Sequence, residues 1–214
     1  MKSFFIHPLT LRLLSVVIAF GIWEYLGRIP ISPAFPTFLQ TMSALGGMIA
    51  DGSMLAVYPA TFQPLLIGLI ISSILGIACG VFMGLNAKAE WFGAPVFIIL
   101  QSAPLAALIP LLTFAYGIGL TSKILTVCIM AMPVIVLNAY SAVRHTPTSM
   151  IEMGRSYLGS SRQIILKIII PSASPVIYAG LRLGAAMGFI GAILAELLIT
   201  PTGIGDLITY NQSI

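Results

Sequence analysis

The sequence predicts an all-α protein that spans a membrane several times. Of its 214 residues, 58% are hydrophobic and 7% are charged, whereas an ordinary globular domain is about 45–50% apolar and about 25% charged. A soluble chain of this length would have too few polar groups to cover its surface. The apolar residues also gather into five stretches, each near the roughly 20 residues that cross the hydrocarbon core of a bilayer as a helix.

The five predicted spans are separated by connectors rich in Pro, Ser, Asp and Lys. The first span follows a basic start, but no small-x-small cleavage site follows it, so we interpret it as a retained span and not as a signal peptide. The less apolar segment Pro36–Pro59 predicts a short surface helix and a loop. The predicted spans are Leu11–Gly27, Ala60–Met83, Pro95–Tyr116, Ile124–Ala142 and Val176–Ile199.

The basic residues predict the orientation, because cytoplasmic connectors carry an excess of Lys and Arg. With the N-terminus in the cytoplasm, only Arg28 and Lys123 of the ten Lys and Arg residues lie on the outer side. This topology puts residue 214 on the outer side, so either the C-terminus is external or a last span is missing from this sequence. The basic residues inside or at the inner edge are Lys2, Arg12, Lys88, Arg144, Arg155, Arg162, Lys167 and Arg182.

Two spans carry glycines at intervals of four residues. This spacing puts small residues on one helix face and lets two backbones approach closely. We expect helix packing within one subunit, and the alternative is a subunit interface or a sliding surface. The glycines are Gly76, Gly80 and Gly84 in the second span and Gly180, Gly184 and Gly188 in the fifth.

Prolines interrupt the third and fourth spans. Ser102, Pro104 and Pro110 belong to the third span, and Pro133 belongs to the fourth. A proline removes a backbone hydrogen bond, and in lipid the freed carbonyl needs a partner from protein or water. We therefore predict that these residues face the bundle interior and line a translocation path. The alternative is that they reflect only the higher frequency of proline in membrane helices.

Glu196 is a carboxylate within the last predicted span. Such a residue is costly in a membrane and by default suggests a function, so we place it with the translocation path. Because it lies about a turn from the outer helix end, snorkelling or pairing with a neighbour is an equal alternative. Arg182, near the inner end of the same span, is expected to extend to the interface.

Other functional classes find little support in the sequence. Cys79 and Cys128 lie in apolar runs and are interpreted as small packed hydrophobes. His7 and His145 form neither a metal-binding spacing nor a nucleophile pair, so no metal or catalytic site is predicted. No lysine follows a glycine, which excludes a Walker A loop. The basic residues are scattered and not interleaved with aromatic residues, which argues against binding of nucleic acid.

The segment "EMGRSYLGSSRQIILKIIIP", from Glu152 to Pro171, is unusually charged for this chain. Ser149 and Glu152 have the spacing of a capping box, which predicts a short helix to about Leu158. "GSS" should interrupt it, and a second helical piece should end in a break at Pro171. The hairpin would either bind anionic lipid headgroups or dock a cytoplasmic partner.

This segment resembles the cytoplasmic EAA loop of binding-protein-dependent ABC transporter permeases. That pattern reads E-A-A, three residues, G, nine residues and I-x-L-P. Glu152 matches the glutamate, and the ending matches at Ile168, Ile170 and Pro171, with Ile in place of Leu. Met153 and Gly154 replace the two alanines. The glycine falls one place late, at Gly159, and Leu158 stands in its expected position.

Other stretches resemble the nitrate, sulfonate and taurine importer permeases, and the likeness runs from Pro33 onward. They are "QSAPLAALIPLLTFAYGIGLTSKI", "MPVIVLN", "AGLRLGAAMGFIGAILAELL" and "GIGDLI". The resemblance implies the type I ABC importer permease fold, with a sixth span missing at the C-terminus. It also implies one permease domain over 1–214, with a core of about 55–214 and a coupling loop of about 144–171.

The same resemblance implies a permease subunit, not an enzyme, in a bacterial inner membrane. Expected partners are ATPase subunits that bind ATP and Mg, a second permease copy, membrane lipid, and a periplasmic or lipoprotein solute-binding protein that delivers a small anion or related compound. No cofactor is expected on this chain. The alternatives are a stand-alone secondary transporter or channel, and a scaffold or intramembrane enzyme. The residues expected to contact the ATPase are Glu152, Met153, Gly154, Arg155, Leu158 and Gly159.

Overall fold

The computed structural model describes residues 8–29, 35–199 and 202–212, and those residues contain helices and no strands. The predicted all-α class is therefore confirmed. The chain forms two compact units, Met1–Ala56 and Val57–Ile214, which are described separately. Four of the described helices are long and apolar enough to cross a membrane, and a fifth crossing is obtained if one bent helix pair is counted as a single span.

The first unit contains α1 (Pro8–Arg28) and α2 (Phe38–Ala50). The ring of Phe38 stacks on Phe20, with centroids 4.6 Å apart, and meets the edge of Trp23 at 5.5 Å. Thr37 and Gln40 form a capping box that starts α2. The predicted short helix is thus present. However, α3 (Ser53–Leu85) already begins at Ser53, so most of the predicted loop before Ala60 is helical.

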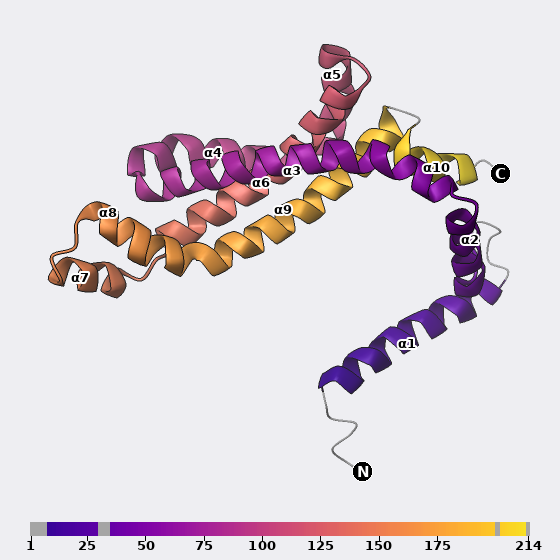
Figure 1. Ribbon diagram of the computed structural model, residues 1–214, viewed down its shortest axis with the longest axis horizontal. Helices are drawn as coiled ribbons and strands as arrows, with labels where there is room; N and C mark the ends of the chain where they lie inside the picture. Colours follow the sequence, from indigo (N-terminus) through magenta and orange to yellow (C-terminus); the bar gives the residue numbers. More distant parts are fainter. Residues whose placement is uncertain (1–7, 30–34, 200–201, 213–214) are drawn as a thin grey trace, which may run out of the picture. The chain divides into compact units, whose positions relative to one another are not determined.

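The core of the second unit is a three-helix layer in which α6 contacts both other helices, and these two also touch each other where Gly188 faces Leu69. α6 (Leu120–Arg144) contacts both α3 and α9 (Ile170–Leu198), as Figure 1 shows. Gly76, Gly80 and Gly84 face Ile135, Ala139 and Val143 in that order, so α3 and α6 run parallel. α9 runs antiparallel to α6, because Gly180, Gly184 and Gly188 meet Asn138, Ile135 and Ala131 in descending order.

The glycine spacing explains how closely these helices pack. A Cβ atom added at Gly80 would lie 2.5 Å from the backbone oxygen of Val136 and 2.6 Å from Cβ of Ala139. Both of these atoms are part of, or attached directly to, the α6 backbone, so neither can move aside as the end of a flexible side chain could. The two glycine rows therefore let α6 approach a neighbour on each side.

Replacing Gly80 with Ala should destabilise the protein by about 1–3 kcal/mol, because the added methyl group overpacks the contact between α3 and α6. Thermal unfolding of the purified protein in detergent measures this loss. Gly21→Ala in α1 is the matched control, since a Cβ there meets nothing within 4 Å. An equal fall in Tm for both variants would contradict the packing interpretation.

The third predicted span is present but is not one continuous helix, in keeping with the prolines that interrupt it. The chain forms α4 (Ala87–Ser102) and α5 (Leu105–Tyr116), which are bent by 106° at the break between them. Pro104 directly precedes α5, where a proline has no N–H to continue the hydrogen-bond ladder of α4. Because α3 and α6 are parallel, the bent pair must return the chain across the layer once, so it serves as one span.

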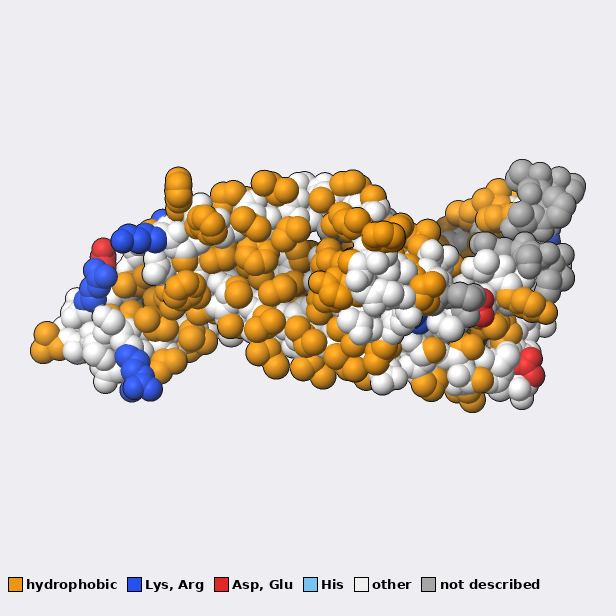
Figure 2. Space-filling view, turned by 90° about the horizontal axis from the view of Figure 1, so that it is seen from above, with side chains coloured by type: hydrophobic (Ala, Val, Ile, Leu, Met, Phe, Trp, Pro, Cys, Tyr) orange, Lys and Arg blue, Asp and Glu red, His pale blue; other side chains and the backbone are white. Residues whose placement is uncertain are grey.

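The chain turns from α6 into α9 through α7 (Thr148–Ser156) and α8 (Ser161–Ile164). A π-helical segment, Ile165–Ile169, joins α8 to α9 without interruption. The break expected at Pro171 is therefore absent: Pro171 lies in the first turn of α9, where its missing N–H is tolerated. Figure 2 shows hydrophobic side chains along this unit and a gathering of Lys and Arg at the end where α7 and α8 lie.

Candidate functional site

α7 is a short helix held against the start of the last long helix by Gly154. A Cβ at Gly154 would lie 2.5 Å from Cδ1 of Ile168 and 3.3 Å from Cγ1 of Ile164, so only glycine fits without movement of these side chains. The N–H of Gly159 donates to the carbonyl oxygen of Gly154 at 3.0 Å and closes the C-terminal end of α7. Of the six residues predicted to couple to a partner, these two glycines hold the loop together.

The capping box expected at Ser149 and Glu152 was wrong. α7 starts after Pro147, and no side chain caps it. The capping box forms instead at the next helix, where the Ser160 hydroxyl accepts from the N–H of Gln163 and the Gln163 side chain accepts from the N–H of Ser160. The sequence carries this S-x-x-Q signal in the part that was expected to interrupt the helix.

Leu158 has a left-handed backbone conformation, with φ of +56°, and is the one described non-glycine residue with a positive φ. It occupies the position at which the EAA pattern has glycine, and this backbone geometry explains that preference, because αL costs a non-glycine residue about 1–2 kcal/mol. The side chain receives no packing in return, since Leu158 is 93% exposed. A strained and exposed leucine suggests a role outside this chain.

Three further apolar side chains are exposed beside Leu158. Met150 and Met153 lie one turn apart on α7, and Tyr157, which ends the helix, is 83% exposed. We call Met150, Met153, Tyr157 and Leu158 the apolar α7 face. Glu152 is exposed and contributes a carboxylate next to this face. Methionine and leucine side chains in this arrangement can fill a hydrophobic groove on another protein.

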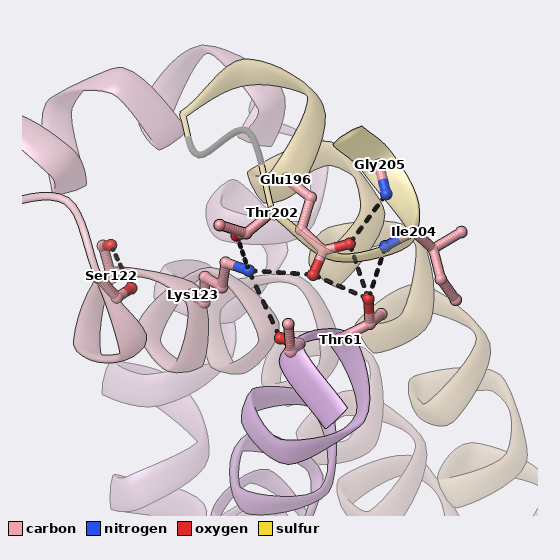
Figure 3. A network of polar contacts seen from close by, with 9 residues as sticks. Thr61, Ser122, Lys123, Glu196, Thr202, Ile204 and Gly205 are labelled. Atoms are coloured by element: carbon pink, nitrogen blue, oxygen red, sulfur yellow. Dashed lines mark hydrogen bonds and ion pairs between the residues drawn. The ribbon is translucent and has the colours of Figure 1, made fainter. Parts of the chain in front are cut away.

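A buried ion pair lies at the opposite end of the three-helix layer. The Nζ atom of Lys123 is 3.0 Å from Oε1 of Glu196, and their side chains are 6% and 0% exposed. Thr61 donates its hydroxyl to the same carboxylate at 2.9 Å, and the N–H of Gly205 donates to it at 3.1 Å (Figure 3). We call these four residues the ion-pair cluster. It joins α3, α6, α9 and α10 (Gly203–Gln212).

The remaining hydrogen bonds of the cluster satisfy its other polar groups. Lys123 also donates to the Thr202 hydroxyl at 2.9 Å and to the Ala60 carbonyl at 3.4 Å. The N–H of Ile204 donates to the Thr61 hydroxyl at 3.0 Å. A buried charge is tolerated only when it is paired and hydrogen-bonded in this way. The carboxylate of Glu196 is therefore engaged by these partners and holds helices together.

Two glycines at the start of α10 let the backbone close over the carboxylate. Gly203 has a φ of +80°, and a Cβ there would collide with the carboxylate of Glu196. A Cβ at Gly205 would lie 2.5 Å from Cβ of Glu196. The "GIG" sequence thus supplies both the left-handed turn and the close approach that the ion-pair cluster needs.

Replacing Gly203 with Ala should loosen α10 from the ion-pair cluster. The left-handed φ alone costs an alanine about 1–2 kcal/mol, and the collision adds to this. Limited proteolysis should therefore cut α10 of Gly203→Ala faster than α10 of the parent protein. Gly47→Ala, at a position where a Cβ meets nothing within 4 Å, is the control. Unchanged protection of α10 would contradict the proposed closure.

The residues predicted to line a path do not come together. Ser102, Pro104 and Pro110 are exposed on the bent α4–α5 pair, whereas Pro133 is buried in α6 beside Phe97 and Leu100. Pro133 and Glu196 are thus buried and the other three residues are exposed, and a path lined by all five stays a prediction.

Sequence reasoning missed Lys123 and Thr61. Lys123 was assigned to an outer connector, but it lies in α6 and is buried. Thr61 was not singled out at all. The available signal was the presence of one cation and one carboxylate at the same predicted depth, near the outer ends of the fourth and fifth spans.

Comparison with known proteins places this arrangement in a family. Residues 72–214 match the model of the binding-protein-dependent transport system inner membrane component. A Bacillus subtilis permease assigned to aliphatic sulfonate transport is 26% identical, over 92% of this chain and 72% of its own. The taurine transport system permease of Escherichia coli is 25% identical, over 94% of this chain and 76% of its own.

A solved structure has the same fold. It is the inward-facing MetNI methionine ABC transporter, of which one chain superposes with a TM-score of 0.56 at 22% identity, over 71% of this chain and 78% of that chain. The family match covers well over half of the chain and includes α7 and, from the ion-pair cluster, Lys123, Glu196 and Gly205. The chain therefore belongs to the family of inner-membrane components of binding-protein-dependent transport systems, as the permease subunit of an ABC importer.

Proposed function

We propose that α7 is the helix through which a separate ATPase subunit drives this permease. The observation that carries the proposal is the apolar α7 face, which is exposed although Gly154 and Gly159 fix the rest of the loop. The ATPase would bind ATP and Mg, since this chain has no Walker A sequence. Closure of two ATPase subunits would push on α7, and α7 would pass this motion to α9 through Ile164 and Ile168.

We propose that the N-terminus and α7 lie in the cytoplasm. The charges support this orientation more strongly than a count of residues does. Arg28, on the proposed outer side, lies 2.8 Å from Glu24, and Lys123 is neutralised by Glu196. Arg155, Arg162 and Lys167 at the other end form no ion pair with any described residue. The unpaired positive charge is therefore concentrated near α7, as the positive-inside rule requires of a cytoplasmic loop.

We propose that a second copy of the chain covers the bent α4–α5 pair and that the solute crosses between the two copies. Ser102 and Pro104 lie at the break between α4 and α5, and both are exposed. The break is about 24 Å from the start of α4, a distance that is within the thickness of a bilayer. Backbone groups freed at that depth need partners from protein or a water-filled path. Leu111 and Phe114, which are 62% and 91% exposed on α5, offer apolar area to the second copy.

The proposed solute is a small anion of the nitrate, sulfonate or taurine type, or a related small organic compound, delivered by an external binding protein. The support is the similarity to the sulfonate and taurine permeases. The charge of Lys123 is already engaged by Glu196, so it is not available to select an anion. Selectivity would therefore rest mainly on the external protein.

An assay of the assembled transporter tests this function. The tagged full-length chain is purified in detergent with its copurifying subunits and reconstituted into liposomes. We expect an ATPase with a Walker A sequence to copurify and the external binding protein to stimulate its ATP hydrolysis. Solute uptake that needs no ATPase and follows an ion gradient would instead support the stand-alone transporter, which the family match disfavours.

A further inference from the structure

A pocket of about 360 Å³ lies where the ends of α3 and α6 meet α7 and α8. Its polar lining consists of Arg144, Arg155 and Ser161, and its apolar lining includes Ile151, Ile164 and Ile165. The pocket is partly open, and its residues come from α3, α6, α7, α8 and the π-helical segment, of which α3 is far from the others in the sequence. It lies at the end of the membrane-spanning layer, on the side of the basic loop.

The charge within the pocket is only partly balanced. The Nε atom of Arg144 lies 3.2 Å from Oε2 of Glu90, and Glu90 also accepts the Tyr140 hydroxyl at 2.6 Å. Arg155 forms no ion pair with any residue in the described part of the chain. The pocket is therefore lined by the unpaired Arg155, by Arg144, which is paired with Glu90, and by apolar side chains.

Arg155 faces a different neighbourhood from the apolar α7 face. It lines the pocket together with Ile151, one turn earlier on the same side of α7. Met150, Met153 and Tyr157 follow another side of the helix. One side of α7 is thus free to dock a protein while the other presents a cation to the pocket.

We propose that this pocket binds an anionic phospholipid. Its phosphate would lie between the guanidinium groups of Arg155 and Arg144 with the Ser161 hydroxyl as a donor, and its acyl chain would follow the isoleucines toward the bilayer. Guanidinium groups bind phosphate through paired, charge-assisted hydrogen bonds. Basic pockets between membrane helices on the cytoplasmic side suit such headgroups. The apolar walls favour a lipid over a free anion, because a soluble phosphate would leave them uncovered.

The lipid would have a mechanical consequence. The bound lipid would connect α7 to the ends of α3 and α6. This connection would add to the contact of Gly154 with Ile164 of α8 and Ile168 of the π-helical segment. This inference concerns a lipid site and not the ATPase contact, so the two proposals stand or fall separately.

Native mass spectrometry of the full-length chain tests the site. The protein, stripped of lipid in detergent, is titrated with phosphatidylglycerol, phosphatidylcholine and, in a third arm, the soluble headgroup glycerol 1-phosphate. We expect phosphatidylglycerol to bind at least tenfold more tightly than phosphatidylcholine and glycerol 1-phosphate to bind weakly. Arg155→Gln should weaken the binding of phosphatidylglycerol about tenfold or more, as expected for the loss of a charged hydrogen-bond donor.

Two further variants make the result decisive. Arg162→Gln removes an exposed positive charge from the neighbouring α8 without touching the pocket lining, and it should leave the affinity unchanged. Arg155→Lys keeps the charge and should retain part of the affinity. Equal losses in Arg155→Gln and Arg162→Gln, or equal binding of the two phospholipids, would overturn the proposal. Tight binding of glycerol 1-phosphate would overturn the lipid as the ligand.

Discussion

Replacing Lys123 with Ala should lower the stability of this protein by about 3–5 kcal/mol, because it leaves the Glu196 carboxylate buried without its counter-ion. The carboxylate would keep only the hydroxyl of Thr61 and the N–H of Gly205 as donors. For a chain of this length, such a loss corresponds to a fall in Tm of roughly 10 °C. Thermal unfolding in detergent can be followed by a thiol-reactive dye, since Cys79 and Cys128 are free and only partly exposed.

The first unit provides a matched control. Arg28 pairs with Glu24 at 2.8 Å, but its side chain is 67% exposed, so Arg28→Ala should cost at most about 1 kcal/mol. The double variant Lys123→Met with Glu196→Leu should recover much of the loss, because neither charge is then left unpaired. A fall in Tm for Lys123→Ala no larger than that for Arg28→Ala would show that the buried pair does not hold these helices together.

Removing the apolar α7 face should have the largest effect on transport. Exposed apolar anchors of an interface contribute at least about 2 kcal/mol each when they become buried by a partner, which is about 30-fold in Kd. Met153→Asp should therefore weaken association with the ATPase by at least this factor and abolish transport-coupled ATP hydrolysis. Association is measured by titrating the purified ATPase onto immobilised permease in detergent.

Leu158→Gly separates docking from folding. Glycine relieves the left-handed strain at φ +56°, so the loop should fold at least as well as in the parent protein. If Leu158 is an anchor, this variant should nevertheless bind the ATPase more weakly. Leu166→Ala, at an exposed position on the same loop but outside the apolar α7 face, should retain binding. Undiminished binding by both Met153→Asp and Leu158→Gly would remove the basis for the docking proposal.

The helices of this chain could be predicted from sequence where the apolar pattern was long. Spans were expected at the positions of α1, α3, α6 and α9. A run of about 20 apolar residues is most stable as a membrane-spanning helix, so these four were predictable. An interruption at Pro104 was expected, but the size of the bend between α4 and α5 was not, because a proline within an apolar run is compatible with both a kink and a break. The choice depends on the neighbouring helices, which the local sequence does not contain.

The sites were predictable to different degrees. The charges and the EAA spacing predicted a helical loop at the position of α7 and α8, and the structure shows that Leu158, at the glycine position of the pattern, has a backbone conformation that favours glycine. The ion-pair cluster was missed because Thr61, Lys123 and Glu196 are brought together by packing, although they lie up to 135 positions apart along the chain. A buried Lys at the start of a helix cannot be told from an exposed one by its immediate neighbours.

The most direct test of the central claim is photo-cross-linking of α7 to the ATPase in native membranes. A photoreactive phenylalanine analogue replaces Met153 in one variant and Phe114, which is exposed on α5, in another. We expect the analogue at 153 to form a covalent adduct with an ATPase subunit that carries a Walker A sequence, and the analogue at 114 to form none. An ATPase adduct at 114 but not at 153 would contradict both the proposed orientation and the coupling role of α7.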